Sequence, residues 1–71
     1  MDKQFFRELL PLVNDREQYS SLKDYAKARI LHYHGLLETA KDYQRVLEIQ
    51  GAIAELKRIE TLRDEVTKGA E

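Results

Sequence analysis

Two histidines, His32 and His34, are the residues best suited to bind a metal ion or to transfer a proton. Their spacing argues against a shared metal site, because residues two apart on a helix point about 200° away from each other. Histidines that bind one metal from a single helix lie three or four residues apart. We therefore expect neither histidine to bind a metal, and we expect no cofactor.

The other polar residues form no pattern that is typical of catalysis. The chain contains no cysteine, which excludes a thiolate nucleophile or metal ligand. It also lacks the Glu-x-x-His pair of helical carboxylate metal sites and the glycine-rich loop of nucleotide sites. A chain of 71 residues folded as helices encloses little space for a substrate. We expect a protein that is not an enzyme and that binds no small-molecule substrate.

The charged residues are balanced in sign and spread along the chain. There are 12 Lys and Arg residues and 13 Asp and Glu residues. A nucleic-acid-binding face would gather basic residues on one side, and no such cluster is present. No apolar run approaches the ~20 residues that span a bilayer. We expect the partner to be a protein, either a different protein or further copies of this chain in a homo-oligomer, rather than nucleic acid or a membrane.

The composition predicts an all-α fold in a single domain of residues 1–71. The chain has one proline and three glycines, and strong helix formers dominate it. A short N-terminal helix is predicted at about residues 3–10, preceded by Asp2 as the N-cap and ending near Pro11.

Two longer helices are predicted after Pro11, at about residues 15–40 and 42–67. Asn14 and Asp42 are the expected N-caps, and Gly69 is expected beyond the end of the second helix. Apolar residues recur at steps of three and four in both helices. The first stripe contains Tyr19, Leu22, Ala26, Ile30, Tyr33, Leu37 and Ala40. The second contains Val46, Ile49, Ile53, Leu56, Ile59, Leu62 and Val66.

The two segments that carry these stripes, residues 14–40 and 42–68, are equal in length. Equal lengths predict a long antiparallel two-helix hairpin whose stripes pair along their full extent. Two consecutive three-residue steps, from Leu56 to Ile59 and on to Leu62, rotate the second stripe. The open end of the hairpin is therefore expected to face a slightly different direction from the rest.

Two sets of residues are candidates for binding a partner. The first set is a cluster of apolar residues on the predicted N-terminal helix. This helix is too short to be stable in isolation, so the cluster must pack either on the open end of the hairpin or in a partner groove. Small residues in the middle of the second long helix allow close approach of another helix, either within the hairpin or from another subunit. The first set is Phe5, Phe6, Leu9 and Leu10, and the second is Gly51, Ala52 and Ala54.

Part of the second long helix supports a comparison with known proteins. It consists of Val46-Leu47-Glu48-Ile49-Gln50-Gly51-Ala52-Ile53, followed by Leu56-Lys57-Arg58-Ile59. With the capped helix and polar turn before it, this segment resembles small helical-hairpin proteins that tailed bacteriophages encode among their head and morphogenesis genes. The resemblance covers roughly residues 15–62. It implies a non-enzymatic structural or assembly protein, located in the virion or the host cytoplasm, that oligomerises or docks on a larger assembly. The alternative is a small inhibitor or antitoxin-like regulator that binds and blocks one target protein.

Overall fold

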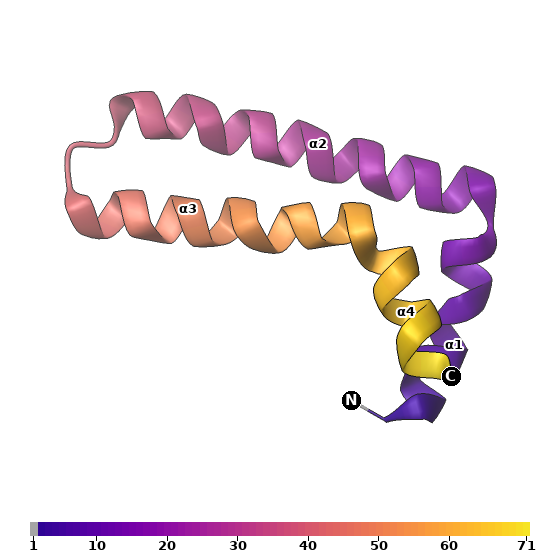
Figure 1. Ribbon diagram of the computed structural model, residues 1–71. Helices are drawn as coiled ribbons and strands as arrows, with labels where there is room; N and C mark the ends of the chain where they lie inside the picture. Colours follow the sequence, from indigo (N-terminus) through magenta and orange to yellow (C-terminus); the bar gives the residue numbers. More distant parts are fainter. Residues whose placement is uncertain (1) are drawn as a thin grey trace.

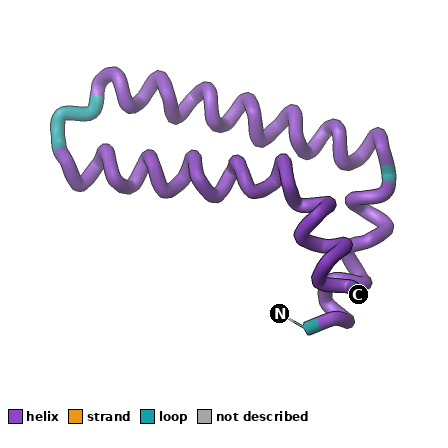
Figure 2. Tube along the Cα trace, viewed as in Figure 1, coloured by secondary structure: helices purple, strands orange, loops and turns teal. Residues whose placement is uncertain are grey.

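The computed structural model describes residues 2–71, and helices joined by short connections account for nearly all of them (Figures 1 and 2). The predicted all-α class is confirmed, since no strand occurs in this range. The elements in chain order are α1 (Lys3–Asn14), α2 (Arg16–Thr39), α3 (Tyr43–Arg58), the 3₁₀ turn η1 (Ile59–Thr61) and α4 (Leu62–Ala70).

Aspartate side chains cap the starts of α1 and α3, as the sequence predicts. The carboxylate of Asp2 accepts a hydrogen bond from the backbone N–H of Phe5 at 2.8 Å. The carboxylate of Asp42 accepts one from the N–H of Gln44 at 2.9 Å. Each bond satisfies a backbone donor that has no partner within the first turn of a helix.

The predicted end of the first helix near Pro11 is wrong, because α1 continues through Pro11 to Asn14. A proline inside a helix removes one N–H donor and costs about 3 kcal/mol. Burial beyond the proline offsets this cost, since Val13 is buried where α1 packs along α4. Asn14 therefore ends α1 and is not the cap of α2. That cap is Asp15, whose carboxylate accepts from the N–H of Gln18 at 2.9 Å.

The helices are arranged as two antiparallel pairs that meet at a bend. In Figure 1, α2 and α3 lie side by side, and the chain turns sharply at η1 so that α4 leaves this pair and packs against α1. The molecule is L-shaped and elongated, with extents of 44 × 25 × 13 Å. The expectation that residues 14–40 and 42–68 pair along their full length is therefore wrong. The sequence predicted that the apolar stripe rotates at Ile59 and Leu62. At this point the structure has a break in the helix, the 3₁₀ turn η1, rather than a gradual change of direction.

The hydroxyl of Tyr19 forms hydrogen bonds with backbone groups that lack helical partners at the break. It donates to the carbonyl of Ile59 at 2.7 Å, lies 3.2 Å from the carbonyl of Glu60 and accepts from the N–H of Arg63 at 3.1 Å. Breaking a helix leaves carbonyls and N–H groups without intrahelical partners, and buried groups of this kind are costly. One buried side chain of α2 therefore stabilises the bend between α3 and α4.

The buried core is small and divides between the bend and the α2/α3 pair. The buried apolar residues are Val13, Tyr19, Ala26, Ile49, Ile53 and Val66. All except Val13 belong to the two stripes predicted from the sequence. Elsewhere along the pair, the apolar side chains are only half-buried or exposed, because no third helix of the described chain covers α2 and α3.

Candidate protein interface

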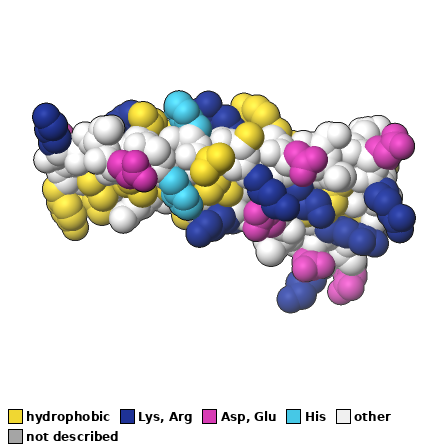
Figure 3. All heavy atoms as spheres, turned by 90° about the horizontal axis from the view of Figure 1, so that it is seen from above, with side chains coloured by type: hydrophobic (Ala, Val, Ile, Leu, Met, Phe, Trp, Pro, Cys, Tyr) yellow, Lys and Arg dark blue, Asp and Glu magenta, His cyan; other side chains and the backbone are white. Residues whose placement is uncertain are grey.

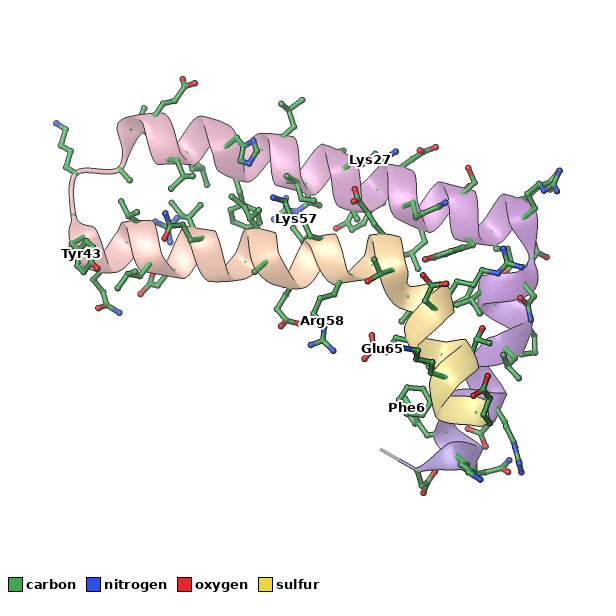
Figure 4. All side chains as sticks on the ribbon, in the orientation of Figure 1. Phe6, Lys27, Tyr43, Lys57, Arg58 and Glu65 are labelled. Atoms are coloured by element: carbon green, nitrogen blue, oxygen red, sulfur yellow. The ribbon has the colours of Figure 1, made fainter. Side chains whose placement is uncertain are left out.

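The inner side of the bend carries an apolar groove with a charged rim, about 260 Å³ in volume. Its apolar floor comes from α1 on one side and from η1 and the start of α4 on the other. In Figure 4, Phe6, Arg58 and Glu65 lie on this inner side. The floor residues are Phe5, Phe6, Leu9, Ile59 and Leu62, and the rim residues are Glu55, Arg58 and Glu65.

The two phenylalanines have different surroundings in this groove. The Phe6 ring lies on the backbone of α4 at Gly69, where a Cβ atom would overlap it. Gly69 is inside α4, not beyond its end as predicted, because α4 continues to Ala70 alongside α1. Phe5 meets Phe6 edge to face, with ring centroids 6.0 Å apart, and keeps 46% of its surface exposed. Phe6 therefore joins α1 to α4, whereas Phe5 is available to a partner.

The charged rim connects the two sides of the bend. The guanidinium of Arg58 on α3 contacts the carboxylate of Glu65 on α4 at 2.9 Å and that of Glu55 at 3.4 Å. The Glu65 carboxylate, with Glu55 acting in the same direction, raises the pKa of the Arg58 guanidinium above its ordinary value. The rim carries one more negative charge than positive, which favours a partner group that is cationic.

A second candidate surface is the side of α3 that faces away from α2, which we call the outer face of α3. It consists of Tyr43, Leu47, Gly51 and Ala54, at steps of four, four and three that keep them on one side of a helix. Tyr43 is 76% exposed and Leu47 is 45% exposed. A Cβ atom at Gly51 would meet no atom within 4 Å. This apolar face is open to solvent and leads toward Arg58 and the groove.

The structure places the predicted partner-binding residues in three different environments. Phe5, Phe6 and Leu9 line the groove. Gly51 and Ala54 lie on the outer face of α3, whereas Leu10 and Ala52 are half-buried and belong to neither surface. Close packing at Gly51 within the hairpin, one of the two interpretations of its small size, is wrong because the space beside it is empty.

Several residues of these surfaces escaped the sequence analysis. Tyr43 and Leu47 could have been recognised from their spacing, because they lie on α3 opposite the buried Ile49 and Ile53. Ile59 and Leu62 line the groove because the helix breaks at η1. The apolar stripe in the sequence predicted a continuous helix there, so these two contributions could not be foreseen.

The remaining surface shows no single chemical character. In Figure 3, Lys and Arg side chains are interspersed with Asp and Glu, and the two histidines lie apart from each other. No group of three or more metal-ligating side chains occurs among residues 2–71. None of the helices in this range combines the length and apolar composition needed to cross a bilayer. No family model, curated protein or solved structure matches the chain.

Proposed function

We propose that this chain is a non-enzymatic structural or assembly protein whose α2/α3 pair is a helical hairpin preceded by a shorter helix. It associates with further copies of itself or docks on a larger protein assembly. The observation that carries this proposal is the surface left exposed. The chain exposes 5505 Å², whereas a compact monomer of 8.4 kDa exposes about 4,600 Å².

The difference of about 900 Å² matches the surface that one partner loses in a typical protein interface, which is about 800 Å². The elongated shape is the source of this extra surface. The radius of gyration is 14.8 Å, compared with about 11 Å for a compact domain of this length. A protein partner that covers the exposed apolar faces would provide the second layer that stable domains normally have.

The resemblance of residues 15–62 to hairpin proteins of tailed bacteriophages supports a more specific setting for this assembly role. We place the protein in a virion or in the host cytoplasm during head morphogenesis. The proposed partner is a protein in either case, since Lys and Arg side chains are interspersed with Asp and Glu on the face that Figure 3 shows.

The groove at the bend favours the second candidate, a small inhibitor or antitoxin-like regulator. Its volume of about 260 Å³ is smaller than typical small-molecule sites, which begin at about 300 Å³, and suits an anchoring side chain of a protein. Such a regulator would fold as a monomer and bind one different protein. An oligomeric assembly protein and such a regulator therefore differ in whether the chain associates with itself.

Thermal melting over a hundredfold range of protein concentration separates these two candidates. Association of folded chains raises the melting temperature as concentration increases, by mass action. An assembly protein that oligomerises predicts such a rise. A melting temperature that is independent of concentration, together with tight binding of one unrelated protein, would favour the regulator instead.

A further inference from the structure

We propose that the outer face of α3 binds the same face of a second copy, with the two α3 helices antiparallel about a two-fold axis. The inference rests on the proposed self-association and identifies the surface responsible for it. The contact residues in each copy are Tyr43, Leu47, Gly51 and Ala54. A two-fold interface must be self-complementary, because the same patch contributes both sides.

The order of large and small residues on this face is self-complementary. In an antiparallel pair, moving toward the C-terminus of one helix corresponds to moving toward the N-terminus of the other. If Tyr43 lies opposite Ala54 of the second copy, then Leu47 lies opposite Gln50 of that copy, one residue away from Gly51. Tyr43 thus meets a small residue and Leu47 lies beside one, which allows the helices to interdigitate at a normal packing distance.

The outer side of α2 is a poorer candidate, although Leu31 there is 73% exposed. The row of α2 that contains Leu31 also contains Asp24, Lys27 and Glu38 at helical spacing. Burying these charges without partners would cost more than burying one leucine gains. The row of α3 from Tyr43 to Ala54 contains no charged residue.

The same register places the loop of each copy near the bend of the other. The loop before α3 carries Lys41, which would lie at the level of Leu56 of the second copy. Asp42, the next residue of this loop, would lie at the level of Glu55, so the loop brings one charge of each sign to the rim of the groove. The inner side of each L-shaped chain then receives the loop end of the other, so the two chains interlock.

Cysteine crosslinking tests the register directly, since the chain contains no native cysteine. Two single variants, Tyr43→Cys and Ala54→Cys, are mixed and treated with a short bis-maleimide linker. The antiparallel register predicts a covalent dimer in the mixture and none in either variant alone. Both positions are exposed on the single chain, so neither change should disturb folding. A dimer from Tyr43→Cys alone would indicate parallel helices and overturn the proposal.

A matched pair of glycine variants provides a second readout that does not depend on the linker. Gly51 and Gly35 are both helical, and a Cβ atom at either position meets nothing within 4 Å. Leucine at either position should therefore preserve or strengthen the single-chain fold. Gly51→Leu should weaken self-association about tenfold or more by overpacking the contact, whereas Gly35→Leu should leave it unchanged. Equal association of both variants and the native chain would overturn the proposal.

Failure of this inference and failure of the proposed function give different results. A native chain that stays at 8.4 kDa at every concentration contradicts self-association itself. A native chain that dimerises while the mixed cysteine variants do not crosslink contradicts only the α3 pairing.

Discussion

At the scale of single residues, the side chain of Tyr19 links α2 to η1 and α4. Its hydroxyl contacts the backbone of η1 and α4, and the ammonium of Lys23 lies 4.8 Å from its ring centroid. The sequence placed Tyr19 correctly on the apolar stripe of the first long helix. Its hydrogen bonds were not predictable, because they depend on where the opposite helix breaks.

Tyr19→Phe keeps the ring and removes only the hydroxyl. The carbonyl of Ile59 and the N–H of Arg63 then lose a partner in a partly buried site. We expect the free energy of unfolding to fall by about 1–3 kcal/mol in urea titrations. Tyr25→Phe is the matched control, because Tyr25 is 61% exposed and should tolerate the change. Equal stability of both variants would contradict the role assigned to the hydroxyl.

At the scale of elements, the helices themselves were largely predictable and their pairing was not. Periodicity located the first long helix, and Asp2 and Asp42 marked two of the starts, but the second predicted helix is broken at η1 into α3 and α4. The partner of the last helix was assigned wrongly, because an apolar stripe shows that a face is buried but not which helix covers it. The contact between Phe6 and Gly69 pairs α4 with α1 instead of α2.

This pairing changes what removal of residues 1–10 should do. The α4 helix has nine residues, which is too short to be stable alone in water. Without Phe6 on Gly69, and without the bond from Arg7 Nε to the carbonyl of Ala70, it loses its packing surface. We expect the α4 amides to lose hydrogen-exchange protection while the α2/α3 amides, as internal reference, keep theirs. Continued protection of α4 would show that α1 does not stabilise it.

At the scale of the whole molecule, the sequence indicated that burial would be incomplete but not where. The short length and the small number of strong core positions predicted dependence on a partner. The exposed outer face of α3 and the groove at the bend both lie on the concave side of the L, where we propose that a partner binds. Among the predicted residues, Phe5, Gly51 and Ala54 are the ones left open on these two surfaces.

Self-association is the central claim, and light scattering coupled to size-exclusion chromatography tests it most directly. The measured mass is followed as the loaded concentration of the native chain increases. We predict a mass that rises from 8.4 kDa toward a whole-number multiple, with twice that value as the first step. A mass of 8.4 kDa at every concentration would contradict the account.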